Sequence, residues 1–107
     1  MSENTDNIDN IKVDKEDTNI IFIGSKPFMN YVTAVVMQFT TKDINEVVVS
    51  ARGKFISKAV DIVEVARRRF LKEKNIQIKS IGINSEEFVN KEGKKITVST
   101  MDIVLAK

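Results

Sequence analysis

The sequence contains neither cysteine nor histidine. Without cysteine the chain forms no disulfide and has no thiol nucleophile. Without histidine it lacks the commonest metal ligand and the side chain that most often acts as a general base near neutral pH. We therefore expect a protein that is not an enzyme, with no catalytic residues, no metal, no cofactor and no small-molecule substrate. An enzyme built on carboxylates or lysines remains open from the residues alone.

Long apolar runs are also missing. The longest apolar segment, from Phe28 to Phe39, is interrupted by Asn30, Thr33 and Gln38, whereas a membrane-spanning helix needs about 20 mostly apolar residues. The first residues lack the basic and apolar regions of a signal peptide. We therefore expect a soluble cytoplasmic protein that does not insert into membranes. Its 107 residues fit one domain with one core.

Charge is distributed unevenly along the chain. The net charge is +2, but residues 1–19 carry −4 and the remaining residues therefore carry +6. The acidic residues of the first segment are Glu3, Asp6, Asp9, Asp14, Glu16 and Asp17, against Lys12 and Lys15. Polar acidic segments without hydrophobic periodicity stay unfolded, so we predict a disordered tail over residues 1–18 and a folded domain over residues 19–107. A basic domain favours nucleic acid or a membrane surface as its partner.

Hydrophobic periodicity predicts four strands and two helices in the order βαβαββ, an α/β fold. The expected strands are residues 19–24, 46–50, 76–83 and 96–105, and the expected helices are residues 27–40 and 54–72. The polar segment over residues 84–95 reads as a long hairpin arm. A right-handed crossover makes the first two strands parallel if they share a sheet, so that their carboxyl ends lie at the same edge.

Each of these two parallel strands leads into a basic, glycine-containing turn that opens a helix. The turns are Gly24-Ser25-Lys26-Pro27 and Ala51-Arg52-Gly53-Lys54. Glycine allows close backbone approach, and helix amino ends attract anions. Lys26, Arg52 and Lys54 are therefore candidate phosphate contacts, although solvated surface charge is the simpler explanation for any one of them. With one tyrosine and no tryptophan, the chain has few aromatic side chains of the kind that stack on bases. We therefore expect it to contact mostly the phosphate backbone of a nucleic acid.

The second predicted helix is unusually apolar. Its apolar residues fill an arc of about 180°, wider than the stripe of a typical surface helix. Such a face suits two partners, its own sheet and a second copy of the chain. We predict an interface between copies at Ile62, Val63, Ala66 and Phe70. The alternative is a helix buried deeply within a monomer.

The charged residues of the same helix have the spacing of surface ion pairs. Lys58 precedes Asp61 by three residues and Glu64 precedes Arg68 by four. These pairs explain the two carboxylates better than a catalytic role does.

Several of these motifs together resemble the Alba family of archaeal chromatin proteins. The resemblance rests on Gly24–Tyr31, Ala51–Asp61, Arg67–Phe70 and Val98–Ile103, in order within residues 19–107. It implies a two-layer α+β sandwich, a four-stranded mixed sheet with both helices on one face, and a homodimer. It also implies a nucleoid-associated protein that binds and compacts double-stranded DNA and also binds RNA.

The resemblance places nucleic-acid contacts at Lys26, Arg52, Lys54, Lys94 and Lys95. It assigns Phe70 to a contact between dimers on DNA.

The chain departs from the family pattern at three places. Ser25 stands where the family usually has a lysine, Ser50 stands where a basic residue is common, and the acidic tail replaces a short leader. Each change lowers the positive potential, so we expect weaker binding than in a typical member. A protein that binds RNA, acting in RNA stability or ribonucleoprotein assembly, is the main alternative, and a protein-interaction module is a third.

Overall fold

The computed structural model describes residues 13–14 and 19–107. Within these residues the strands and helices follow the order β1, β2, α2, β3, α3, β4, β5. Their bounds are β1 Val13–Asp14, β2 Asn19–Phe22, α2 Phe28–Phe39, β3 Glu46–Arg52, α3 Ile56–Val65, β4 Gln77–Val89 and β5 Lys95–Ala106. Apart from β1, this is the predicted βαβαββ order.

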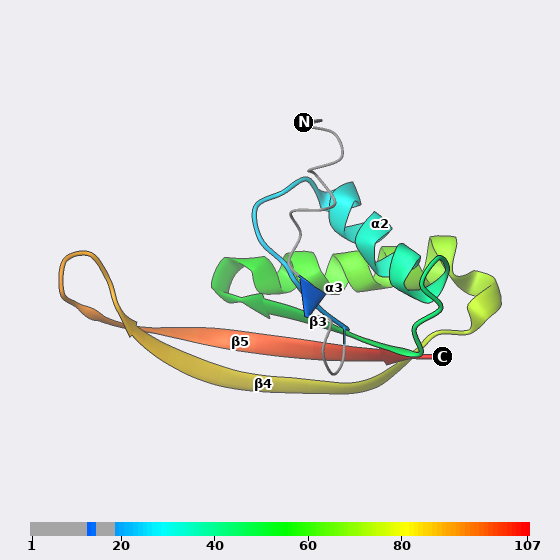
Figure 1. Ribbon diagram of the computed structural model, residues 1–107. Helices are drawn as coiled ribbons and strands as arrows, with labels where there is room; N and C mark the ends of the chain where they lie inside the picture. The colour runs from blue at the N-terminus through cyan, green and yellow to red at the C-terminus, as the bar shows by residue number, and fades with distance from the viewer. Residues whose placement is uncertain (1–12, 15–18) are drawn as a thin grey trace.

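The strands form one mixed sheet in the order β1-β2-β3-β5-β4. β2 and β3 run parallel through the crossover of α2, whereas β5 is antiparallel to both β3 and β4. Both helices lie on one face of the sheet (Figure 1). The predicted two-layer sandwich with four main strands and two helices is confirmed.

The short strand β1 extends the sheet at its edge. Val13 pairs with Ile21 and Asp14 with Ile20, antiparallel to β2. These two residues belong to the segment 1–18 for which the sequence predicts disorder. The other residues of that segment lie outside the described part of the chain.

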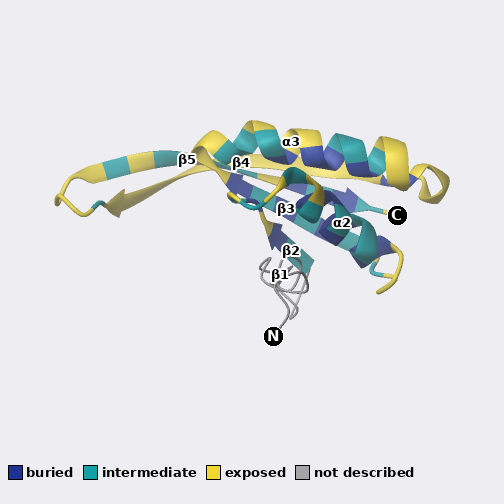
Figure 2. Ribbon diagram, turned by 90° about the horizontal axis from the view of Figure 1, so that it is seen from above, coloured by how far each residue is buried: buried dark blue, intermediate teal, exposed yellow. Residues whose placement is uncertain are grey.

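The core lies between the sheet and the helices. Along β3, Val47, Val49 and Ala51 are buried and alternate with partly exposed residues, as expected for a strand with one face against helices. The apolar faces of α2 and α3 complete this core, and their outer faces are exposed (Figure 2). The other large contributors are Ile21, Val32, Val35, Phe39, Ile62, Val63, Leu71, Ile103 and Leu105.

The burial of α3 corrects one prediction. Ile62, Val63 and Ala66 are at most 2% exposed within the single chain, because they pack in the core between the sheet and α2. The assignment of these three side chains to an interface between copies is therefore wrong. The wide apolar arc reflects burial in the chain's own core, and of the four proposed contacts only Phe70, which is 51% exposed, is open to a partner.

The predicted single helix over residues 54–72 is divided into segments. A 3-10 turn, η1 Gly53–Phe55, precedes α3, and a π-helical turn, η2 Ala66–Phe70, follows it. The amide of Leu71 donates to the carbonyl of Ala66, five residues earlier, at 2.9 Å. This wider turn allows both residues to be buried.

No helix in the described residues is long and apolar enough to cross a membrane.

β4 and β5 continue past the end of β3 as a two-stranded arm. β3 ends at Arg52, opposite Thr100, whereas β4 and β5 stay paired as far as Val89 and Lys95. The arm projects well beyond the body (Figure 1). The predicted hairpin arm over residues 84–95 is confirmed.

Candidate nucleic-acid interface

The first basic turn, Gly24–Pro27, is fixed by a buried tyrosine. Pro27 stands at the amino end of α2 with φ −57°, which suits the start of a helix. One turn further on, the Tyr31 hydroxyl accepts hydrogen bonds from the amides of Gly24 at 2.9 Å and Lys26 at 3.2 Å. Tyr31 itself is only 3% exposed. The backbone of the turn is therefore held in one conformation, and Lys26 within it is partly exposed.

Lys58 of α3 binds the carbonyl groups of the same turn. The Lys58 Nζ donates to the carbonyl of Gly24 at 2.7 Å and to that of Lys26 at 2.6 Å. The ammonium also lies 5.0 Å from the centre of the Tyr31 ring, within the range of a cation–π contact. Lys58 thus makes these contacts instead of the predicted surface pair with Asp61, and it ties the start of α3 to the turn before α2.

The second basic turn, Arg52–Phe55, is tight. Gly53 has φ +55°, and a side chain there would lie 3.4 Å from Val98, so glycine suits this backbone. The Arg52 Nη1 donates to Glu86 Oε1 on the arm at 2.7 Å, with both side chains more than half exposed. An ion pair so exposed contributes little to stability, so Arg52 can exchange Glu86 for another anion.

The two turns lie at the same edge of the sheet. β2 and β3 are parallel neighbours, and beyond them the amide of Ile23 donates to the carbonyl of Ser50 at 2.9 Å. Gly24 and Arg52 line one cavity of about 580 Å³ at this edge. Cationic side chains from both turns, Lys26, Arg52 and Lys54, are therefore gathered at the carboxyl ends of β2 and β3, where α/β proteins commonly bind ligands.

Comparison with known proteins identifies the fold and its family. The Alba family model matches residues 19–85. The chain belongs to the Alba family. Two relatives, each named DNA/RNA-binding protein Alba, come from Methanococcus maripaludis and Methanocella arvoryzae. They are 45% and 47% identical over 89 residues, which cover 83% of this chain and 98% and 90% of the relatives.

Solved structures agree with this assignment. Alba from Thermoplasma volcanium matches with a TM-score of 0.76 and 42% identity, over 83% of this chain and all of the other. ALBA1 from Trypanosoma brucei matches with a TM-score of 0.62 over 87% of this chain and 72% of its own, and at 23% identity it supports the fold alone.

In this Alba-family chain the other two predicted contacts, Lys94 and Lys95, lie at the tip of the arm. The turn there is closed by Asn90, whose Oδ1 accepts the amides of Glu92 and Lys94, each at 2.9 Å. Because the arm begins where β3 ends at Arg52, it leaves the body from the same edge as the basic turns. Within one chain, however, the structure does not bring the tip to the turns (Figure 1).

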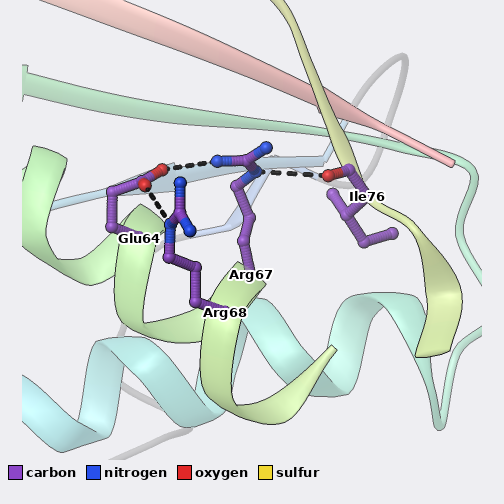
Figure 3. Close-up of polar contacts among 4 residues, drawn as sticks. All are labelled: Glu64, Arg67, Arg68 and Ile76. Atoms are coloured by element: carbon purple, nitrogen blue, oxygen red, sulfur yellow. Dashed lines mark hydrogen bonds and ion pairs between the residues drawn. The ribbon is translucent and has the colours of Figure 1, made fainter. Parts of the chain in front are cut away.

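The arginine cluster at the end of α3 is engaged in structural contacts. Glu64 accepts hydrogen bonds from Arg67 at 2.6 Å and Arg68 at 2.9 Å, and Arg67 Nε also donates to the carbonyl of Ile76 at 3.2 Å (Figure 3). The hydrogen bonds from Arg68 and Arg67 hold the pKa of Glu64 below its ordinary value. The predicted pair of Glu64 and Arg68 is present, and the cluster joins the helix end to the segment that enters β4.

Three residues of the candidate interface are not evident from the sequence. The sequence leaves Tyr31 as either a helix-surface residue or a locally hydrogen-bonded one, and the structure has the local hydrogen bonds. Lys58 reads as one half of a surface pair. Glu86 meets Arg52 only because of the register of β4 on β5. A signal for Tyr31 exists in hindsight, since it lies one helical turn after Pro27 and so faces back toward the preceding loop.

Proposed function

We propose that this Alba-family protein is a dimeric chromatin protein that binds double-stranded DNA through its phosphates with little sequence specificity and compacts it. The observation that carries the proposal is the pair of basic turns held together at one sheet edge by Lys58. The names of the two curated relatives support a nucleic-acid partner. The protein would then be found in the cytoplasm, on the nucleoid.

The cations are placed to follow a polyanion. Lys26, Arg52 and Lys54 occupy the body, and Lys94 and Lys95 would extend the contact along the arm. Lys26 is partly exposed and the other four are exposed, so phosphates can reach all five without opening the core. Contacts of this kind supply affinity and register but carry no sequence information.

An uncovered apolar stripe supports the dimer. Ile81 and Ile83 of β4 pair with Ile103 and Met101 of β5, so their side chains share the sheet face on which the helices lie. They are nonetheless 56% and 77% exposed. A second copy that covered this edge of the sheet would bury them, and it would join two sets of basic turns into one larger surface. Phe70 would remain as the contact between neighbouring dimers.

Charge reversal at the second turn tests the proposal. In the double variant Arg52→Glu and Lys54→Glu, duplex DNA affinity should fall about a hundredfold or more at low salt, because phosphate contacts become repulsive. The wild-type affinity should decrease linearly on a log–log plot against salt, with a slope near −0.9 for each phosphate neutralised. The matched control reverses Lys72 and Lys74, which lie beyond the carboxyl end of α3 in the 3-10 turn η3 Lys72–Lys74. Sedimentation should show the same dimer in all three proteins, and equal titrations would refute the phosphate contacts.

RNA is the second candidate partner. It is favoured by Phe22, an aromatic ring 47% exposed beside the first basic turn, because single-stranded RNA is held by aromatic stacking as well as by phosphates. A role in RNA stability or ribonucleoprotein assembly would follow. Crosslinking in cells and sequencing of the bound nucleic acid distinguishes the two candidates.

A further inference from the structure

The cavity between the two basic turns has a composition unlike that of the turns themselves. It measures about 580 Å³, which is within the usual range of ligand pockets, and Arg52 is the one cation among the described residues that line it. Two carboxylates, Glu86 and Asp102, also line it, and Glu86 is bonded to Arg52. Over the described residues the two carboxylates outnumber the one cation. The interior of the cavity is therefore less suited to a phosphate than the cations at its rim are.

The cavity also contains an aromatic platform. The strand register places Phe22 beside Ser50, and Ser50 beside Asp102, across three neighbouring strands. Side chains directly opposite one another share a face. Because the residues flanking them, Ile21, Val49 and Ile103, face the core, this row lies on the sheet face away from the helices. Phe22 presents 47% of its surface there, with Ser50 between it and the Asp102 carboxylate.

We propose that this cavity binds one unpaired nucleobase that carries an exocyclic amino group. The proposal rests on the proposed function, since the base arrives on a strand whose phosphates the basic turns hold. The base stacks on the ring of Phe22, and its amino group donates a hydrogen bond to the Asp102 carboxylate. Aspartate accepts from the amino group of cytosine in this way, whereas uracil presents a carbonyl oxygen at that position and is repelled.

The polar groups of the cavity fit a base better than other ligands. A flat, neutral ring with N–H donors matches an aromatic face beside carboxylate and hydroxyl oxygens, here Asp102, Ser50 and Thr100. A duplex keeps its bases stacked and paired, so it cannot fill the cavity without extruding a base, which costs a few kcal/mol. The cavity therefore gives the protein a preference for single strands that the basic turns alone do not provide.

The test measures binding of short oligonucleotides that hold one protein unit. These are a cytosine 12-mer and a uracil 12-mer, each as RNA and as DNA, and a duplex of the same length. The wild type should prefer cytosine to uracil. Phe22→Ala should weaken cytosine binding about tenfold and leave duplex binding within twofold, and Asp102→Asn should abolish the preference for cytosine over uracil. Equal RNA and DNA results are expected, since the contacts are to the base.

Two controls keep the outcome clear. Val60→Ala shortens an apolar side chain of similar exposure, 40%, on α3 and should change neither affinity. If Phe22→Ala does not fold, Phe22→Leu keeps the apolar volume without the aromatic face. If the variants weaken single strand and duplex equally, or change neither, the base site is refuted while the phosphate proposal stands. If the wild type binds no oligonucleotide at all, the proposed function itself fails.

Discussion

The molecule has two basic regions at opposite ends of α3, and they differ in what their cations contact. At the carboxyl end, Arg67 and Arg68 share Glu64, and Arg67 also reaches the carbonyl of Ile76. At the amino end, Lys58 holds the backbone of the neighbouring turn, while Lys26 is partly exposed and Lys54 is exposed.

The comparison teaches that cation density alone does not locate a binding surface. The run of three arginines is the denser cluster in the sequence, yet the contacts of Arg67 and Arg68 connect the end of the helix to the segment that enters β4. Each turn has fewer cations, but the protein orders the backbone of the first turn and leaves the charges of both turns accessible. A preorganised cationic turn loses less conformational entropy when it binds an anion.

Of the substitutions that test the difference between the two basic regions, Lys58→Met should have the largest effect on stability and DNA affinity. The variant removes two charge-assisted hydrogen bonds to the turn, so the free energy of unfolding should fall by about 2 kcal/mol. DNA affinity should fall as well, because the turn that carries Lys26 is no longer fixed. Denaturant unfolding and duplex titration measure the two quantities.

Lys54→Met is the matched control, since it removes the same charge from the neighbouring turn. It should weaken DNA binding with little change in stability. Amide hydrogen exchange at Gly24 and Lys26 should accelerate in Lys58→Met alone. If both variants have the same stability and exchange, Lys58 does not anchor the turn.

The sequence is sufficient to predict the strands, the turns and their shared edge. The β-branched run Val47–Val49 and the glycines that follow two strand ends are local signals, and the parallel crossover follows from handedness. The role of Lys58 could not be predicted, because a lysine three residues before an aspartate looks the same whether it bonds along its helix or across to a loop. Likewise, the arc of apolar residues around Ile62 has the same width whether sheet and helix or a second subunit covers it.

The second prediction concerns the opposite end of α3. Arg67→Met should lower the free energy of unfolding by about 1 kcal/mol, because it removes hydrogen bonds to Glu64 and to the Ile76 carbonyl. Affinity for a short DNA duplex should stay unchanged. Arg69→Met is the control, since this exposed residue is close in sequence to Arg67. A loss of affinity equal to that of Lys58→Met would show that the two ends do not differ as proposed.

The acidic tail allows a third, smaller test. β1 runs antiparallel to β2, so Val13 lies toward the end of β2 that leads into the first basic turn. We expect the −4 charge of the first segment to compete with nucleic acid for the turns. Replacing Glu3, Asp6 and Asp9 by their amides should tighten duplex binding about threefold at low salt and have no effect at high salt. Equal affinities at low salt would leave the tail with a solubilising role.

The smallest expected effect is on the pH dependence of stability. The pKa of Glu64 is lowered in the folded protein by hydrogen bonds from Arg68 and Arg67. A carboxylate of this kind stabilises the fold fully above its unfolded pKa, whose ordinary value is 4.5, and loses that contribution as the pH falls through the lower folded pKa. Glu64 is 37% exposed, so solvent screening limits the contribution to less than about 1 kcal/mol.

The measurement compares wild type with Glu64→Gln in denaturant unfolding at pH 7 and at several values below 4.5. The variant should be less stable at pH 7, and the difference should shrink as the pH falls. Asp43 is the necessary control, because its hydrogen bond and ion pair with Lys107 also lower its pKa and it titrates in the same range. Asp43→Asn should leave the Glu64 difference intact, since the two carboxylates have separate partners. A difference independent of pH would mean that Glu64 stabilises the helix end by packing rather than by its charge.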